Sequence, residues 1–512
     1  MNPKFSRRAF TAAAFSAITS RRSFAFQTPE RKIELHAGIS HGLIKPELHG
    51  SFAEHLGSCT YGGLWVGRES KIPNINGYRK QAVEYLRTLG IPVLRWPGGC
   101  FADDYHWRDG IGPPEKRPKT VNIHWGNYTE DNSFGTHEFM GLCKLIGSEP
   151  YLAGNVGSGT PQELRNWVEY CNYSSGSTLS DERAHNGSPE PFGVKYWGVG
   201  NENWGCGGNM TPEEYAGYYR QFRSYMRPYG DTRPFLIACG PNSNDLDWSR
   251  RFMSTIRANS LPNGFAMHFY SNSKLPATKF TPEAMQDQFG SFTRMEAAIN
   301  QQRALLDTYD PDRRVGLMID EWGIWDQMQP DEQKKYGRLW QQIPVRGAIA
   351  AALGLNVFHR QADKLTMCNI AQTVNVLHAI LLTEEDKCIR TPAYWAFQLM
   401  KDHRGKRSVL AKSGDDSWQD LSVSASRDDK QMVVTFVNPK HDTGAKVNCA
   451  LIGGSAAGGT AQVLHHPDLN ATNTFENPDA IVPGDHKVNA QGGRIEVEMP
   501  ALSIVTAKIR LA

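Results

Sequence analysis

Short apolar runs alternate with longer amphipathic stretches from about residue 48 to residue 383, and this alternation restricts the possible folds more than any other feature. The apolar runs have the length of buried strands, and the amphipathic stretches have the period of surface helices. A helix that follows each strand carries the chain back, so that successive strands pair in parallel. About eight such units predict an α/β fold, a (β/α)8 TIM barrel with long loops.

Eight segments are expected as the barrel strands. In chain order they are Gly50–Phe52, Val93–Trp96, Tyr151–Ala153, Val194–Val199, Phe235–Cys239, Phe265–Phe269, Val315–Ile319 and Leu355–Phe358. The helical patterns between them include Gly77–Leu89, Pro161–Cys171, Thr211–Tyr229 and Gln333–Leu353. Thr211 followed by Pro212 and two glutamates is a typical helix start, because the hydroxyl and the acids satisfy free N–H groups of the first turn.

The pattern changes after about residue 383. Short alternating runs separated by glycine pairs appear at 422–424, 432–437, 461–464, 494–498 and 503–509. They predict an antiparallel, jelly-roll-like β-sandwich over residues 384–512, behind a catalytic barrel at 48–383. Residues 31–44 also alternate, so we expect the segment 28–47 to add one or more strands to that sandwich.

Residues 1–27 have the features of a targeting leader. A twin-arginine pair, Arg7-Arg8, precedes the apolar stretch Phe10–Thr19, and Ser23-Phe24-Ala25 offers small residues for cleavage. The leader predicts export to the periplasm or the extracellular medium. A disordered tail is the alternative, because Arg21-Arg22 interrupts the passage from the apolar stretch to the cleavage site.

Composition excludes several classes of partner. A formal net charge of +3 over 512 residues offers no nucleic-acid footprint, and no internal run approaches the roughly 20 apolar residues that cross a bilayer. The nine cysteines are scattered and form no Cys-x-x-Cys pair, and their odd number leaves at least one thiol free in a monomer. No His-x-His or His-Glu-x-x-His pattern follows a strand, so no metal or other cofactor is expected.

Two of the expected strands end in a glutamate that has a tryptophan close by. Val194–Val199 is followed by Glu202 and Trp204, and Val315–Ile319 is followed directly by Asp320-Glu321 and a tryptophan. In a barrel of this kind the carboxyl ends of the strands face the active site. Either glutamate alone would more often belong to a surface turn. Two carboxylates at strand ends three βα units apart indicate glycoside hydrolysis.

Seven blocks resemble, in order, the α-L-arabinofuranosidases of glycoside hydrolase family fifty-one. They are Gly50–Gly57 (GSFAEHLG), Leu94–Phe101 (LRWPGGCF), His106–Pro113 (HWRDGIGP), Gly200–Asn203 (GNEN), His268–Tyr270 (HFY), Asp320–Trp322 (DEW) and Asn369–Asn375 (NIAQTVN). The family belongs to a clan of barrel enzymes with catalytic glutamates on strands four and seven. The resemblance covers nearly the whole chain after the leader, and it implies a C-terminal sandwich that includes an N-terminal strand.

The resemblance implies a role for each matching residue. Glu202 would be the acid/base, and Glu321 the nucleophile that forms a covalent arabinosyl-enzyme. Five further residues would bind or position: Asn201 at the 2-hydroxyl of the sugar, Glu54 and Gln372 at other hydroxyls, Tyr270 at the nucleophile and His268 near the acid/base. His268 could instead be a core histidine. Many relatives have asparagine where this chain has Cys100, so we expect Cys100 to pack against the sugar, which leaves the preferred sugar less defined.

The predicted function is release of terminal α-L-arabinofuranosyl groups from oligosaccharides or polysaccharides, by an exo-acting, retaining mechanism. For retention the two carboxyl groups should lie about 5 to 5.5 Å apart. A β-xylosidase or an endo-β-glucanase of the same clan would use the same two glutamates. A non-catalytic carbohydrate-binding barrel would need neither. The resemblance also implies a homo-oligomer, a trimer or a hexamer.

Overall fold

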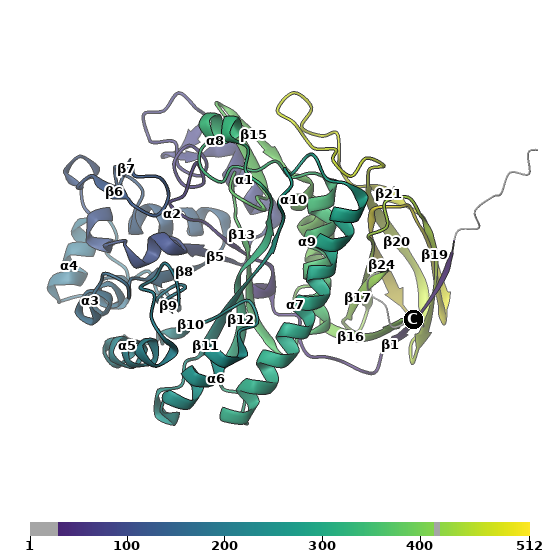
Figure 1. Ribbon diagram of the computed structural model, residues 1–512, viewed down its shortest axis with the longest axis horizontal. Coiled ribbons are helices and arrows are strands. Elements are labelled where there is room, and N and C mark those ends of the chain that lie inside the picture. The colour runs from purple at the N-terminus through teal and green to yellow at the C-terminus, as the bar shows by residue number, and fades with distance from the viewer. Residues whose placement is uncertain (1–28, 414–419) are drawn as a thin grey trace, which may run out of the picture.

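The computed structural model describes residues 29–413 and 420–512, so the predicted leader at 1–27 lies outside the described residues. A closed parallel barrel and a mainly antiparallel sandwich lie side by side (Figure 1). This arrangement confirms the predicted fold class. Among the described residues no helix is both long and apolar enough to span a membrane.

Eight parallel strands close the barrel. They are β2 (Gly50–Phe52), β5 (Val93–Trp96), β8 (Glu149–Gly154), β9 (Tyr196–Val199), β10 (Phe235–Asn242), β11 (Gly264–Asn272), β12 (Gly316–Trp325) and β13 (Leu365–Ala371). β13 pairs with β2 and completes the ring. Glu202 follows β9, the fourth strand, and Glu321 lies in β12, the seventh.

Helices surround the barrel and return the chain between its strands. They are α1 (Lys80–Leu89), α2 (Thr136–Ile146), α3 (Pro161–Asn172), α4 (Thr178–His185), α5 (Pro212–Tyr225), α6 (Leu246–Thr255), α7 (Pro282–Tyr309), α8 (Pro330–Tyr336), α9 (Val345–Arg360) and α10 (Pro392–Met400). Thr160, Thr211 and Thr281 each cap a helix by accepting a backbone N–H of its first turn, and proline follows each of them. These capped helix starts fix the ends of the loops that precede the helices, and such loops carry the site.

The prediction for the eighth strand was wrong. Leu355–Phe358 lies in α9, and the strand is Leu365–Ala371. All residues of α9 are buried because the helix lies between barrel and sandwich (Figure 1). A helix that is apolar on every side has no amphipathic period, so its apolar run cannot be told from that of a buried strand. The predicted helix Gln333–Leu353 is accordingly split between α8 and α9.

The sandwich is a ten-stranded sheet that curls until β20 pairs with β24. Its strands are β1 (Glu30–His36), β16 (Arg407–Ser413), β17 (Ser422–Arg427), β18 (Gln431–Asn438), β19 (Ala445–Ile452), β20 (Ala456–His465), β21 (Gly484–His486), β22 (Val488–Gly492), β23 (Arg494–Met499) and β24 (Ser503–Leu511). β1 lies between β16, to which it is antiparallel, and β19, to which it is parallel. β1, the first strand of the described chain, is thereby held between two strands from its C-terminal part.

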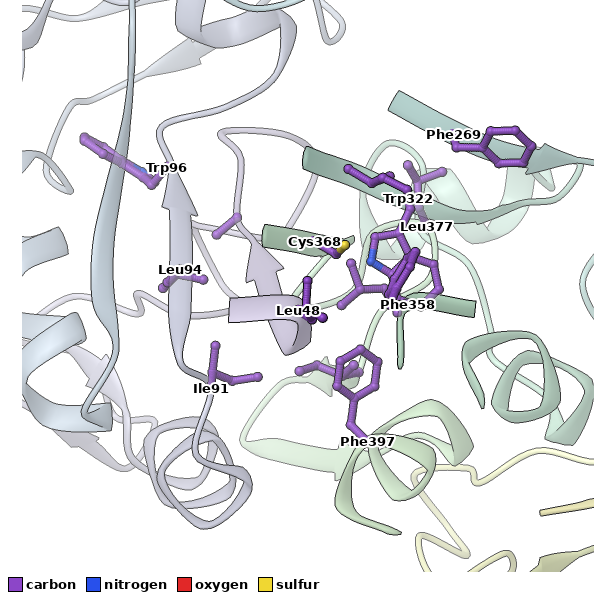
Figure 2. Close-up of a cluster of buried hydrophobic side chains, with 14 of the residues drawn as sticks. Leu48, Ile91, Leu94, Trp96, Phe269, Trp322, Phe358, Cys368, Leu377 and Phe397 are labelled. Atoms are coloured by element: carbon purple, nitrogen blue, oxygen red, sulfur yellow. The ribbon is translucent and has the colours of Figure 1, made fainter. Parts of the chain in front are cut away.

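The core behind β12 fixes the strand that carries Glu321. Trp322 is buried and meets the ring of Phe358 edge to face at 4.9 Å between centroids (Figure 2). A side chain at Gly354 of α9 would come within 2.4 Å of the Trp322 ring, so only glycine allows this approach. The tryptophan beside the predicted nucleophile therefore packs into the core, on the face of the strand opposite to the site.

Three buried histidines lie where the barrel meets the sandwich. The Nε2 atoms of His49 and His359 are 2.8 Å apart, so one ring must offer an unprotonated nitrogen to the other. His359 and His403 also bond to serine and threonine hydroxyls of β17 and β18. Burial lowers the pKa of His403 to about 3, and burial together with neighbouring cations lowers those of His49 and His359 well below the usual range.

We expect acid to weaken the fold through these histidines. An unfolded histidine takes up a proton near pH 6.5 and the buried one does not, so each stabilises the fold fully above pH 6.5 and loses that contribution as the pH falls. The loss at pH 5 should be roughly 2 kcal/mol for His403, whose pKa in the folded protein is about 3. Urea unfolding from pH 7 to pH 5 measures it. His403→Gln should reduce the slope against pH and the exposed control His185→Gln should not; equal slopes in both would contradict this interpretation.

Candidate active site

The guanidinium of Arg95 connects three strands of the barrel. It projects from β5, is buried, and lies 4.6 Å from the centre of the Phe52 ring. Nη1 donates to Oε1 of Glu321 at 2.7 Å, and Nη2 donates to Oδ1 of Asn201 at 2.6 Å. The planar guanidinium presents several donors in one fixed plane, so a single side chain orients both acceptors.

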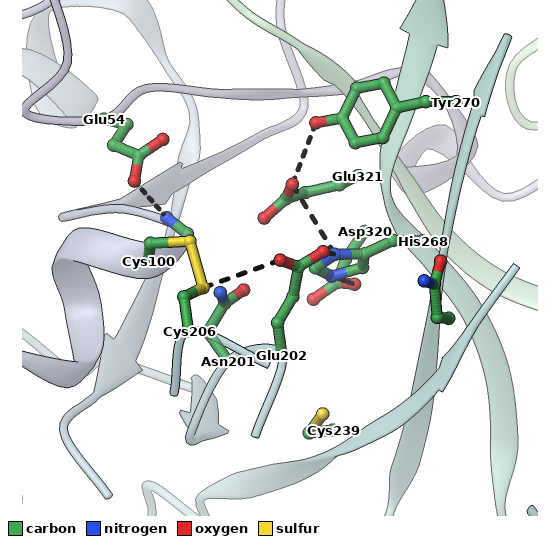
Figure 3. A network of polar contacts seen from close by, with 12 residues as sticks. Glu54, Cys100, Asn201, Glu202, Cys206, Cys239, His268, Tyr270, Asp320 and Glu321 are labelled. Carbon is green, nitrogen blue, oxygen red and sulfur yellow. Dashed lines mark hydrogen bonds and ion pairs between the residues drawn. A yellow bond between two sulfur atoms is a disulfide. The ribbon is translucent and has the colours of Figure 1, made fainter. Parts of the chain in front are cut away.

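Glu321 is held from two sides. One carboxylate oxygen accepts from Arg95, and the other accepts the hydroxyl hydrogen of Tyr270 at 2.8 Å (Figure 3). Only 8 % of the Glu321 side chain is exposed. Burial and the nearby Glu321 carboxylate raise the pKa of Tyr270 well above its usual range, so the tyrosine remains a hydrogen-bond donor. A carboxylate fixed in this way is oriented for attack from one direction.

Glu202 stands on a strained turn after β9. Its φ of 42° is in the left-handed region, which costs a residue other than glycine about 1 to 3 kcal/mol. The turn is held below by Asp103, which accepts the backbone N–H of Asn201 at 2.7 Å. The same carboxylate accepts the backbone N–H groups of Val156 and Gly157, which follow β8. Through these hydrogen bonds Asp103 connects the backbone that follows the third strand to the backbone that follows the fourth, next to Glu202.

His268 of β11 lies between the two glutamates. Its Nδ1 is 2.7 Å from Oε1 of Glu202 and 3.5 Å from Oε2 of Glu321, and its Nε2 is 3.1 Å from Asp320. Burial opposes a charge on this ring, but the surrounding carboxylates outweigh it and raise the pKa of His268 to about 10. The raised pKa favours a charged ring at neutral pH, and its contacts place His268 between the two carboxylates.

The two glutamates are close together. Carboxylate oxygens of Glu202 and Glu321 and a ring nitrogen of His268 all lie within 4.8 Å of one another. Inverting glycosidases need about 6.5 to 9.5 Å between their carboxyl groups to admit a water molecule, whereas retaining enzymes have about 5 to 5.5 Å. The separation in this chain is shorter than inverting enzymes require and fits direct attack on the sugar.

A third buried carboxylate, Glu54, lies beside the pair. It accepts the backbone N–H groups of Gly99 and Phe101, the indole N–H of Trp125 at 2.9 Å and the amide of Gln372 at 3.1 Å. Burial and the Glu321 carboxylate raise the pKa of Glu54 to about 7. Near neutral pH it therefore exists in both protonation states, and it can accept or donate a hydrogen bond to a hydroxyl.

Two of the buried polar atoms that make no hydrogen bond among the described residues belong to amides that contact Arg95 or Glu54. They are Nδ2 of Asn201 and Oε1 of Gln372, whose other amide atoms are already hydrogen-bonded. A buried polar group without a partner costs about 1 to 3 kcal/mol. One free donor and one free acceptor next to the carboxylates suit a ligand that carries hydroxyl groups.

Cys100 forms a disulfide with Cys206, 106 residues further along the chain (Figure 3). The bridge joins the 3-10 helix Cys100–Asp103 to the loop that begins at Asn201, and Sγ of Cys206 lies 3.6 Å from Oε2 of Glu202. Sequence reasoning placed Cys100 against the sugar and did not pair it. No spacing rule pairs cysteines this far apart, because the pairing depends on how the loops fold.

Comparison with known proteins identifies the family. The model described as Alpha-L-arabinofuranosidase 1 domain matches residues 85–294, and that of the Alpha-L-arabinofuranosidase C-terminal domain matches 320–503. A relative from Bacteroides ovatus, named an intracellular exo-alpha-L-arabinofuranosidase, is 41% identical over 493 residues, which cover 93% of this chain and 95% of the relative. The chain belongs to the α-L-arabinofuranosidase family. The predicted family and enzyme class are confirmed.

Solved structures of this family have the same fold. The GH51 arabinofuranosidase from Xanthomonas axonopodis pv. citri superposes with a TM-score of 0.90 at 37% identity, and covers 94% of this chain and 99% of its own. The α-L-arabinofuranosidase from Thermotoga maritima, solved as an arabinose complex, superposes with a TM-score of 0.84 at 28% identity, and covers 94% and 100%. Barrel and sandwich are therefore a shared architecture of these enzymes.

The prediction of export is contradicted. The Bacteroides ovatus relative is named an intracellular enzyme, and residues 1–28, which hold the expected twin-arginine leader, lie outside the described residues. An arginine pair followed by a modest apolar stretch is a short pattern of low specificity. Arg21-Arg22 further weakens it, because a signal peptide passes from its apolar stretch to small residues without such charges.

Sequence reasoning missed several residues that build the site. Arg95 lies in a motif used for the resemblance, but the spacing of the motif does not show which groups its side chain contacts. Trp125 reaches Glu54 from the hairpin of β6 (Thr120–Asn122) and β7 (Tyr128–Glu130). The β6–β7 hairpin joins no barrel strand, so no periodic pattern locates it.

We expect Asp103→Asn to impair the acid/base selectively. In either orientation an amide would turn its NH2 group toward at least one backbone N–H donor, so the turn would shift, and a displacement of about 1 Å costs on the order of 10²-fold in rate. The loss should be larger for poor leaving groups than for activated aryl glycosides.

Asp310→Asn is the matched control. Asp310 is also buried and accepts a backbone N–H, that of Val315, but it precedes β12 at the opposite end of the barrel. Melting temperatures and kcat/KM of both variants should be measured. Equal kinetic losses in the two variants would assign Asp103 to stability alone.

Proposed function

We propose that this chain releases terminal α-L-arabinofuranosyl groups with retention, with Glu321 as the nucleophile and Glu202 as the acid/base. The separation of their carboxylate oxygens, within 4.8 Å, is the observation that carries the proposal. The family membership supports the sugar, and the geometry supports the order of events.

Glu321 would attack the anomeric carbon in the first step. Arg95 and Tyr270 hold its carboxylate, and Glu202 gives its proton to the departing glycosidic oxygen. Asn201 is oriented by Arg95 and has a free Nδ2. That donor would bind the 2-hydroxyl, a contact that strengthens as the sugar approaches an oxocarbenium ion.

Water would release the sugar in the second step. Glu202 takes a proton from the water, which attacks the anomeric carbon and frees Glu321. The His268 cation can interact with whichever of the two carboxylates is charged, because it is within 3.5 Å of both. It thereby limits the cost of moving negative charge between them through a buried site.

The remaining polar groups would bind the other hydroxyls of the terminal sugar. Glu54 is hydrogen-bonded to both Gln372 and Trp125, and these three residues would line one part of the sugar site. The Cys100–Cys206 bridge would line the part beside Glu202. Terminal groups of arabinoxylan, arabinan or arabinogalactan are the proposed natural substrates. Product analysis on these polymers should show arabinose alone; arabino- or xylo-oligosaccharides would favour an endo-acting glycanase.

Loss of the nucleophile should abolish turnover. We expect Glu321→Ala to lower kcat for para-nitrophenyl α-L-arabinofuranoside by at least about 10³-fold, since the covalent route is removed. The surface variant Glu190→Gln is the control and should keep full activity. Full activity in Glu321→Ala would contradict the assignment. A wild-type enzyme that fails to hydrolyse this arabinofuranoside but hydrolyses β-xylosides would change the proposed sugar and leave the proposed mechanism in place.

Loss of the acid/base should depend on the leaving group. Glu202→Ala should lose on the order of 10² to 10⁴-fold on oligosaccharides, whose leaving oxygen needs a proton. It should lose much less in the first step with a dinitrophenyl glycoside, and azide should restore turnover by replacing the activated water. Equal losses on both substrates would argue against Glu202 as the acid.

Assembly into a trimer or a hexamer remains a prediction from the resemblance. Light scattering of the purified protein over a range of concentrations tests it. A mass equal to that of one chain at all concentrations would contradict it.

A further inference from the structure

The Cys100–Cys206 bridge is located where its chemical state affects the acid/base. Both cysteines and Glu202 are half-buried, and Figure 3 shows the bridge directly beside the Glu202 carboxylate. The seven other cysteines are buried as free thiols. Among the described residues, this sulfur pair alone is both oxidised and next to a proposed catalytic group.

The three side chains form a donor set for a soft metal ion. The two sulfur atoms and a carboxylate oxygen of Glu202 all lie within 4.8 Å of one another. Two thiolates bound to one tetrahedral zinc ion at about 2.3 Å would be about 3.8 Å apart. The Cα atoms of Cys100 and Cys206 are 5.5 Å apart, so rotation of the two side chains can provide that separation once the bridge opens.

We propose that Cys100, Cys206 and Glu202 form a zinc site in the reduced enzyme, and that the bound ion inhibits the acid/base. The bridge occupies the site in the oxidised enzyme and keeps the sulfur atoms from binding. Reduction converts it into two thiols, which release their protons when the ion binds. A water molecule or chloride would complete the four ligands. Glu202, as a ligand, could then neither donate nor accept the proton that each catalytic step needs.

A phosphine can reduce the Cys100–Cys206 disulfide to two thiols. Tris(2-carboxyethyl)phosphine attacks one sulfur and breaks the S–S bond, and water then converts the phosphonium adduct to phosphine oxide. The phosphorus gives two electrons to the two sulfur atoms, and the water supplies one oxygen and two protons. Cellular dithiols achieve the same reduction by thiol–disulfide exchange, so the surrounding thiol pool determines which form of the site exists.

The experiment compares zinc binding by the two redox forms of the full chain. Oxidised and phosphine-reduced enzyme, freed of reductant under argon, are dialysed against micromolar ZnCl2 and their zinc content is measured by atomic absorption. The reduced form should hold one more zinc ion per chain. Because the seven buried thiols are present in both forms, the difference reports on the bridge alone. Equal zinc content in both forms would overturn the proposal.

Activity measurements and zinc binding by variants test where the ion binds. Zinc should lower the activity of the reduced enzyme at least about tenfold and that of the oxidised enzyme little, and EDTA should restore it. The Cys100→Ser/Cys206→Ser double variant should bind no additional zinc, and Glu202→Gln should bind it at least about tenfold more weakly, since one ligand has lost its charge. Cys449→Ala, in the sandwich, is the control and should behave as wild type. Zinc binding that is unchanged in the double variant or in Glu202→Gln would also overturn the proposal.

The effect on activity rests on the proposed role of Glu202, whereas zinc binding does not. An oxidised, metal-free enzyme that fails to hydrolyse arabinofuranosides would contradict the proposed function and leave the zinc measurement valid. Zinc that binds to the reduced pair but leaves an active enzyme uninhibited would contradict the inference and leave the proposed function intact.

Discussion

A buried guanidinium organises the catalytic end of this barrel. Arg95 links β5 to Glu321 in β12 and to Asn201 after β9, so strands two, four and seven share one hydrogen-bonding centre. Its charge is compensated by Glu321 and Asp320, and removal of one partner from such a buried group typically costs 3 to 5 kcal/mol. Lysine could not replace it, because a single ammonium group lacks the planar array of donors. The orientation of the proposed nucleophile, Glu321, and of the Asn201 amide thus depends on the same side chain.

The proposed acid/base needs a different kind of support, because Glu202 stands on a strained backbone. Asp103 holds the turn through hydrogen bonds, and the Cys100–Cys206 bridge holds it covalently. Both supports start from one short 3-10 helix after β5. The position of Glu202 relative to Glu321 is therefore set by the segment that follows Arg95. One stretch of sequence aligns the two proposed catalytic carboxylates, which come from distant parts of the chain.

The barrel could be predicted because strand and helix periods differ and repeat, and the strand ends then indicated Glu202 and Glu321. Leu355–Phe358 was misassigned because α9 is buried on all sides, and no period shows such burial. The disulfide, the role of Asp103 and the contact of Trp125 with Glu54 depend on where long loops meet in space. A resemblance can name residues along a chain, but it does not state that Cys100 is paired or that His268 lies between two carboxylates.

Trapping of the covalent intermediate tests the central claim most directly. The enzyme would be incubated with a 2-deoxy-2-fluoro α-L-arabinofuranoside that has a good leaving group, digested, and its peptides analysed by mass spectrometry. We expect a single fluoropentosyl label, on Glu321. A label on Glu54 or Glu202 instead, or turnover of the reagent with inversion and no label, would contradict it.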